Sequence, residues 1–377
     1  MSLSRRKTLL LLGGGAVAAA VSGTAAFVGT RTPTQALMPW DAAGGYDDPR
    51  KFALSYALLA PNPHNRQPWV AELVDDDGIR LFRDPDKNLP ATDPFDRQLT
   101  IGMGCFLELL SQAASERGLT ADITLFPEGD GDWKPVADIR MVSGANPDPL
   151  FTHVHLRRSC KEPFDMAQPV ADAQITALGQ RMTGPVVFEG TTAGARVDTL
   201  RTIAKDAWTI EAMTPATWGE SVDLLRIGKP EIEANPDGID LGSPLLEVLR
   251  RTGMLGREAL MDTSSGGFTS TMDRYMATFN ATPAFVWLKT AGNSRADQIA
   301  AGRAWVRLNL ATTADGLSLH PVSQALQEFD EMSDPYARIH AELAKPGETV
   351  QMLGRLGYGP IIPKTPRWPL EAKLQNG

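Results

Sequence analysis

Three amide side chains lie close together in the stretch Ala60–Trp69, which reads APNPHNRQPW. They are Asn62, Asn65 and Gln67. Prolines at positions 61 and 63 restrict the backbone between them. Because an amide both donates and accepts hydrogen bonds, such a group can follow the edge of a heterocycle on which donors and acceptors alternate. A turn with polar filler after a helix is the alternative.

A second stretch, Arg157–Phe164 (RRSCKEPF), concentrates positive charge. It holds three cations and a hydroxyl group: Arg157, Arg158, Lys161 and Ser159. Guanidinium, ammonium and hydroxyl donors at this spacing suit a phosphate dianion. A solvated basic turn would have the same composition.

Histidines offer proton transfer or metal binding. His64 lies in the first stretch, and His320 lies in a third, Thr312–Gln324 (TTADGLSLHPVSQ). Each is a weak candidate to donate a proton to a reduced substrate, with a structural hydrogen bond as the alternative. His153 and His155 share one face of an expected strand, but no third ligand lies nearby in sequence, so we expect no metal site.

The three stretches resemble motifs of the nitroreductase-like family of FMN-binding flavoproteins. Ala60–Trp69 resembles the family's A-P-S-x-x-N-x-Q-P-W, with Asn62 in place of serine, and Arg157–Phe164 resembles its R-R-S-x-R-x-F. Thr312–Gln324 resembles the family's G-L-x-x-x-P loop, and the C-terminal Leu356–Leu370 resembles its G-Y-x…R-x-P-L.

The resemblance implies a set of FMN-binding residues. The phosphate would be held by the second stretch and by the C-terminal arginine, and the flavin ring would be approached by the first and third stretches. The implied residues are Asn62, Asn65, Gln67, Arg157, Arg158, Ser159, Lys161, Pro321, Val322, Ser323, Gln324 and Arg367. Ser323 and Gln324 replace the Glu and Gly that are common in the family loop.

Composition narrows the class of protein. The 377 residues carry a net charge of -8, which disfavours nucleic acid as a partner because phosphate backbones bind basic surfaces. No G-x-G-x-x-G or Walker loop is present. The two cysteines, Cys105 and Cys160, can form one bridge, but the apolar helical setting of Cys105 favours free thiols.

The N-terminal residues 1–30 are typical of an export signal. Basic residues at positions 5–7 precede an apolar stretch from Thr8 to Val28. The Arg5-Arg6 pair resembles the twin-arginine signal, which implies the corresponding export machinery as a partner and a periplasmic or cell-envelope location. An uncleaved membrane anchor is the alternative, weakened by the glycines at positions 13–15.

The remaining chain is predicted to hold a linker and two halves. Pro, Gly and Asp mark a linker over 31–48, and Gly144–Pro149 separates a half at 49–143 from one at 150–372. Helices are expected at 52–59, 99–113, 171–181, 197–211 and 295–314, and strands at 69–74, 79–82, 122–126, 135–142, 186–189 and 284–290. Residues 213–282 show no clean hydrophobic period, which suggests a lid. The candidates to cover a flavin ring are Trp208, Trp218, Met213 and Met254.

These features predict an α+β layered sandwich with a central mixed sheet flanked by helices. Each family motif occurs once, and their order is inverted relative to single-domain members, so the resemblance implies an internal pseudo-dimer. We expect an FMN-dependent oxidoreductase that passes electrons to a small-molecule acceptor, with NAD(P)H or a quinone as donor. A flavin-sequestering protein with a lid-closed pocket is the alternative.

Overall fold

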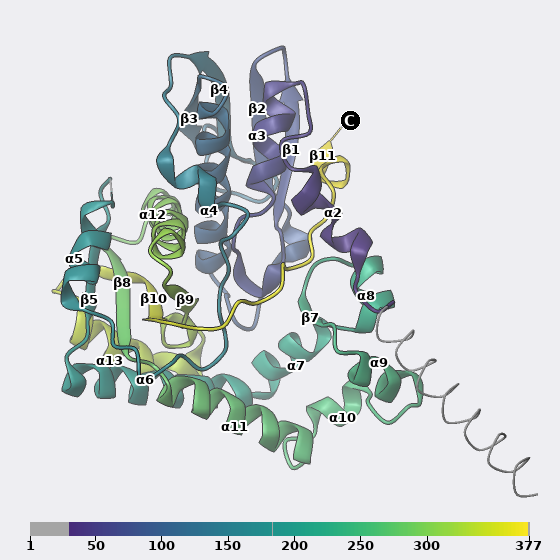
Figure 1. Ribbon diagram of the computed structural model, residues 1–377, viewed down its shortest axis with the longest axis vertical. Coiled ribbons are helices and arrows are strands. Elements are labelled where there is room, and N and C mark those ends of the chain that lie inside the picture. Colours follow the sequence, from purple (N-terminus) through teal and green to yellow (C-terminus); the bar gives the residue numbers. More distant parts are fainter. Residues whose placement is uncertain (1–29, 183, 376–377) are drawn as a thin grey trace, which may run out of the picture.

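The protein is described by a computed structural model over residues 30–182 and 184–375. The predicted export signal, with its Arg5-Arg6 pair, lies outside these residues except for Thr30. The α+β class is confirmed. The strands divide between two main sheets, whereas a single central sheet was expected, and long helices pack between these two layers (Figure 1).

The first half contains a five-stranded sheet with two helices. The order along this sheet is β11-β1-β2-β4-β3, antiparallel except for β11 beside β1. Its α-helices and the strands β1 to β4 match the predicted ones to within three residues at each end, whereas the 3-10 helices η1 and η2 were not predicted. They are α3 (Pro49–Ala57), η1 (Pro63–Asn65), β1 (Trp69–Val74), β2 (Gly78–Arg83), η2 (Pro85–Lys87), α4 (Arg97–Ser115), β3 (Leu119–Leu125) and β4 (Pro135–Ser143).

The second half contains a four-stranded antiparallel sheet in the order β5-β8-β10-β9. The chain then crosses back to the first half, where β11 pairs with β1 (Figure 1). The elements are η3 (Pro149–His153), α5 (Asp172–Gln180), β5 (Val187–Thr191), α6 (Gly194–Met213), β8 (Ala284–Thr290), α12 (Arg295–Ala314), β9 (Ser318–Pro321), η4 (Gln324–Leu326), η5 (Asp330–Met332), α13 (Ser333–Leu343), β10 (Thr349–Gly357), η6 (Leu370–Lys373) and β11 (Leu374–Gln375).

The segment without a clean period is folded. It forms an arm of short elements that extends from α6 along one edge of the molecule (Figure 1). Most of these elements are too short for a hydrophobic period to be visible in sequence. They are α7 (Pro215–Asp223), β6 (Leu225–Ile227), α8 (Gly228–Ala234), β7 (Ile239–Leu241), α9 (Pro244–Arg251), α10 (Arg257–Met261) and α11 (Gly266–Asn280).

Both main sheets repeat one topology. When β11 is left aside, two strands of each sheet precede a long helix and two follow it, and the order across the sheet is first, second, fourth, third. The long helices are α4, with 19 residues, and α12, with 20. In the second half, the arm is inserted between the first and second strands, β5 and β8.

The two long helices cross through a reciprocal glycine contact. Gly104 and Gly302 occupy the same position in their helices, eighth from the N-terminal end. A Cβ atom on Gly104 would lie 2.2 Å from the carbonyl oxygen of Ile299, and one on Gly302 would lie 1.9 Å from that of Ile101. The backbones therefore touch without side chains between them. Such a reciprocal contact is the form that a two-fold interface takes.

Two ion pairs repeat the same reciprocity. Arg97 pairs with Glu328 at 3.1 Å, and Arg295 pairs with Asp130 at 3.7 Å. Each arginine begins one long helix, and each acid follows the strand after the other long helix. The first half and the second half thus exchange equivalent contacts.

Two expectations about local structure were wrong. The predicted linker 31–48 contains a helix, α2 (Thr34–Ala42), because Trp40 is buried and its indole donates to the Thr365 carbonyl. The strand expected at His153–His155 is the end of a 3-10 helix followed by a turn. Both segments are shaped by contacts with distant residues, which local patterns do not record.

Candidate functional site

The first motif forms a loop with unusual backbone angles. His64, Asn65 and Gln67 have φ of 46°, 52° and 50°, a region that non-glycine residues seldom occupy. The loop is stabilised by an internal hydrogen bond, because the backbone N–H of Gln67 donates to Asn62 Oδ1 at 2.7 Å. Clusters of such angles are typical of functional sites, where surrounding structure holds a strained backbone.

The amides of this loop hold other parts of the chain. Asn65 accepts from Arg367 at 2.7 Å and donates to the Pro366 carbonyl at 3.1 Å. Gln67 donates to the Pro236 carbonyl at 2.6 Å and accepts from the Trp368 N–H at 2.9 Å. In this conformation both side chains form hydrogen bonds with other residues of the protein. They join the loop to the C-terminal segment, and Gln67 joins it to the arm.

Two buried arginines cap the end of helix α3. Arg157 donates to the Leu59 carbonyl at 2.8 Å, and Arg367 donates to the carbonyls of Leu58, Leu59 and Ala60. The carbonyls at a helix C-terminus carry partial negative charge, which a cation stabilises. Burial lowers the pKa of Arg157 to about 10 and that of Arg367 to about 9, so both remain charged at neutral pH.

The donors left for a phosphate differ between these arginines. Arg367 uses its Nε and both Nη atoms in five hydrogen bonds to the protein. Arg157 also bonds Asn309, but its Nε is buried without a partner among the described residues. Phosphate binding by Arg367 would therefore require an exchange of partners. Arg158 is half-buried and lies over the Trp40 ring, and Ser159 is half-buried beside it.

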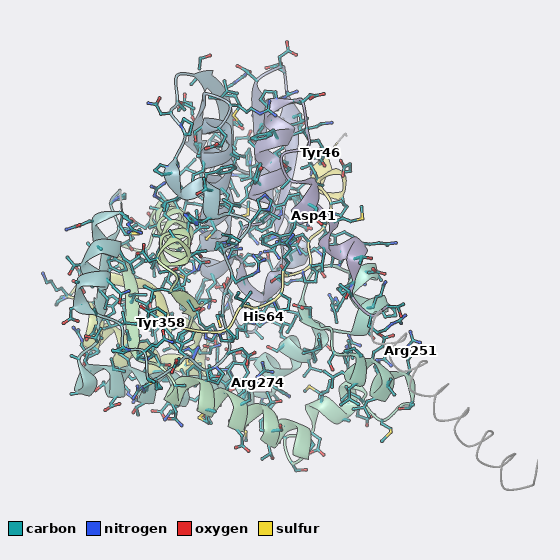
Figure 2. All side chains as sticks on the ribbon, in the orientation of Figure 1. Asp41, Tyr46, His64, Arg251, Arg274 and Tyr358 are labelled. Atoms are coloured by element: carbon teal, nitrogen blue, oxygen red, sulfur yellow. The ribbon has the colours of Figure 1, made fainter. Side chains whose placement is uncertain are left out.

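The positive charge of Lys161 acts on the pKa of four titratable groups from four other segments. We call the five residues the Lys161 cluster. Its members are Lys161, His64, His320, Glu211 and Asp240. Figure 2 shows His64 near the centre of the molecule, between the α4 layer and the arm. The Asp240 side chain is exposed, yet burial raises its pKa, a combination expected in a recess rather than on an open surface.

The histidines of the cluster are neutral at pH 7. Burial, with the charge of Lys161, lowers the pKa of His64 to about 4. Burial, with the charges of Arg355 and then Lys161, lowers the pKa of His320 well below its usual range. His320 Nδ1 accepts from Arg355 Nε at 3.1 Å, which assigns the ring proton to Nε2. Arg355 is in turn fixed by the Thr278 and Glu162 carbonyls.

Glu211 is the cluster's buried carboxyl group. Burial raises its pKa to about 7, against weaker lowering by contacts with Gln327 and Gln324. Two buried oxygens there, Glu211 Oε2 and Gln327 Oε1, have no donor within the described residues. A proton on Glu211 would let it donate to Gln327, which accounts for both oxygens. Sequence patterns missed Glu211 and Asp240, because both lie in or beside the aperiodic segment.

Hydrogen bonds bring the separate motifs together. The Cys160 N–H donates to the Leu319 carbonyl at 3.0 Å, and the Gly359 N–H donates to Ser318 Oγ at 3.2 Å. The Leu59 carbonyl accepts from both Arg157 and Arg367. The four stretches that the sequence singled out therefore meet in one region.

The third motif also contacts the arm. Val322 is fully buried and packs in a cluster with Trp208 and Phe279, while Pro321, Ser323 and Gln324 are partly exposed. Trp208 stacks on Tyr275 with ring centroids 4.2 Å apart. Two of the proposed ring covers, Met213 and Met254, are 54% and 72% exposed. Trp218 instead donates to the Leu260 carbonyl within the arm.

Other features lie outside this region. Both cysteines are free and buried. Among residues 30–182 and 184–375, no three His, Cys, Asp or Glu side chains are grouped so as to hold a metal ion. In the same part of the chain, no helix is both long and apolar enough to cross a membrane. A pocket of about 550 Å³ lies at the N-terminal ends of α4 and α12, lined by residues such as Phe95, Arg97, Ser294 and Glu328.

Comparison with known proteins gave distant relatives. No family model matches the chain. A Mycobacterium tuberculosis protein provisionally named an NAD(P)H nitroreductase is 26% identical over 349 residues, covering 86% of this chain and 93% of the relative. Another protein of that organism, also provisionally named an NAD(P)H nitroreductase, is 38% identical over 77 residues, 20% of this chain and 23% of its own length.

Among solved structures, the FMN-dependent nitroreductase NfnB from Mycobacterium smegmatis in complex with NADPH is 20% identical, with a TM-score of 0.35. It covers 59% of this chain and 94% of its own. A nitroreductase with bound FMN from Bacteroides fragilis is 11% identical, with a TM-score of 0.33 over 57% of this chain and 90% of its own.

Proposed function

We propose that the chain is an FMN-dependent oxidoreductase of the nitroreductase type that reduces a small-molecule acceptor. The observation that carries the proposal is the meeting of the four motif stretches around the Lys161 cluster. The relative that matches along nearly its whole length is named as an NAD(P)H nitroreductase, which supports NAD(P)H as the donor. A quinone-type donor is the alternative if the protein is exported.

The residues present fit an FMN phosphate and a flavin ring, with one change from the implied set. Lys161 has an exposed side chain, and the buried Nε of Arg157 has no partner among the described residues. Together with Arg158 and Ser159, these groups would hold the phosphate. Arg367 would act by positioning the Asn65 loop. When bound, FMN supplies the hydride and electron transfer.

The protein's own groups would manage protons. His64 and His320 are neutral at pH 7, so neither carries an extra proton to give. Glu211 retains a proton close to neutral pH and lies in the same cluster. We therefore infer that Glu211 is a better candidate than either histidine to donate a proton to a reduced acceptor.

The test is the visible absorbance of purified protein with added FMN, NADPH and a nitroaromatic acceptor. Bleaching of the flavin by NADPH, followed by recovery on addition of acceptor, is expected. A protein that binds no flavin would refute the proposal. Bound flavin that neither NADPH nor a reduced quinone bleaches would support the sequestering protein instead.

One observation favours that second candidate. The arm closes on the first motif through the Pro236–Gly238 segment: Gln67 donates to the Pro236 carbonyl, and the Gly238 N–H donates to the Asn65 carbonyl. Asp237 between them is buried and bonded to Lys87 and Arg226. An arm fixed in this way restricts access to the site, as a flavin-holding protein requires.

We also infer that the two halves form an internal pseudo-dimer with one flavin site. The repeated strand order and the reciprocal contacts of α4 with α12 support this inference. The family motifs occur once each, so one FMN per chain is expected from the absorbance of protein saturated with flavin. Two per chain would contradict it.

Export by the twin-arginine route remains a proposal that rests on the Arg5-Arg6 pair. Replacing both residues by lysine keeps the charge but should retain the precursor in the cytoplasm. Fractionation of cells that express each version is the measurement. Normal export of the lysine version would indicate a different signal or an anchor.

A further inference from the structure

The outer end of the arm has an exposed apolar face. Helix α9 (Pro244–Arg251) turns Leu245 and Val248 to solvent, 66% and 40% exposed, and Met254 just beyond it is 72% exposed. Residues three apart lie on one side of a helix. We call Leu245, Val248 and Met254 the α9 face.

Part of this helix has the reverse of the usual orientation. Glu247 is only 2% exposed, while Leu245 and Val248 are exposed and Leu246 and Leu249 are only partly buried. The buried carboxylate accepts from Arg31 at 3.0 Å and from the Lys229 N–H at 3.2 Å, and it pairs with Arg251 at 2.6 Å. Rotating the helix to hide the apolar side chains would strip this carboxylate of its partners, which is strongly unfavourable. The exposure of the α9 face is therefore a fixed property of the fold.

The same contacts place the start of the described chain beside α9. Arg31 pairs with Glu247, and Lys229 Nζ donates to the Thr30 carbonyl at 3.3 Å. In the sequence, only Gly29 separates Thr30 from the apolar stretch Thr8–Val28. A lipid bilayer that held this stretch would meet the α9 face next.

Basic side chains border the face. Arg250, Arg251 and Arg257 have side chains 43%, 55% and 37% exposed, although each also contacts Glu231 or Glu247. Exposed apolar side chains bordered by arginine are typical of helices that lie in the interface of an anionic bilayer. Figure 2 shows Arg251 at the outer end of the arm, away from His64.

We propose that the α9 face docks on an anionic phospholipid bilayer that also holds the N-terminal apolar stretch. A second copy of the chain is a poorer occupant, because a stable interface takes about 20–30 residues from each partner. A face this small can still bind a membrane when another part of the same chain is already held there. The first contact raises the effective concentration of the second. The proposal does not depend on the flavin chemistry.

The test uses the full chain with vesicles of phosphatidylethanolamine and phosphatidylglycerol, some carrying brominated acyl chains. A fluorescent thiol label is attached to Val248→Cys, and the matched control carries it on Val142→Cys, which is 43% exposed on β4. The native thiols, 1% and 3% exposed, should not react in the folded protein. Brominated lipid is expected to quench the Val248 label and leave the Val142 label unchanged.

A second variant tests the face itself. Leu245→Ser in the Val248-labelled chain should reduce the quenching, because burying one leucine in an apolar environment favours binding by about tenfold. Leu156→Ser, at a site 65% exposed, is the matched control and should have no effect. Equal quenching of both labels, no binding to vesicles, or an unchanged signal in Leu245→Ser would each overturn the proposal. Shielding of the Val248 label from aqueous iodide without vesicles would assign the face to a second copy instead.

Discussion

Replacing Glu211 by glutamine should make the protein more stable at alkaline pH and leave its stability at acidic pH nearly unchanged. Burial raises the pKa of this carboxyl group from 4.5 to about 7. The folded state therefore holds the proton more tightly than the unfolded state. The associated stability is fully present below pH 4.5 and is lost as the pH rises through about 7.

The magnitude follows from the shift in pKa. One pKa unit corresponds to about 1.4 kcal/mol, so ionising Glu211 in the folded protein costs about 3 kcal/mol above pH 8. The residue as a whole is partly exposed although Oε2 is buried, which makes this an upper limit. Glutamine cannot ionise, and its amide can donate to Gln327 Oε1 at every pH.

The assay is urea unfolding of the flavin-free protein at pH 5 and pH 8, with Glu258→Gln, at an exposed position in the arm, as the control. Comparing each variant with the parent at the same pH cancels the titration of other groups. Glu211→Gln should gain up to about 3 kcal/mol in unfolding free energy at pH 8 and little at pH 5. An equal effect at both pH values would refute the inference that this carboxyl group is protonated near neutrality.

Four further changes probe the helix crossing, the phosphate site, the cap of helix α3 and the arm. Gly302→Ala should destabilise the fold by about 1–3 kcal/mol or more, because its Cβ would overlap a carbonyl oxygen. Gly194→Ala is the control and should not destabilise the fold, because the space around Gly194 is open. Thermal unfolding measures both variants. Lys161→Gln should weaken FMN binding about tenfold in a fluorescence titration with unchanged stability. Arg367→Gln, unlike Lys161→Gln, should lower the unfolding free energy by about 1–3 kcal/mol, because helix α3 loses its cap. An unchanged unfolding free energy in Arg367→Gln would contradict a positioning role for this residue. Asp237→Asn should loosen the arm and speed its proteolysis, since removing one partner of a buried ion pair costs about 3–5 kcal/mol. An unchanged rate of proteolysis within residues 213–282 would show that Asp237 does not hold the arm in place.

The elements predicted best are those with strong local signals. Helix α12 runs from Arg295 to Ala314 as predicted, because Ser294 and Asp297 form a capping box and its buried residues recur at helical spacing. Strands β1 and β2, both predicted, pair as a hairpin, because the Asp and Gly residues at positions 75–78 between them favour a tight turn. The sequence by itself also determined the motif stretches and their chemistry, since amide, guanidinium and hydroxyl groups are visible in the residue types.

Only the tertiary structure decided how those groups are used. Arg367 looks like a phosphate ligand in sequence, yet in the folded chain its donors all face carbonyls and Asn65. Glu211, at the end of a predicted helix, and Asp240, in a segment without a readable period, join the Lys161 cluster only in the folded chain. Hydrogen-bond partners and pKa values depend on which distant segments pack together and on how far they exclude water, and neither is encoded in the spacing of neighbouring residues.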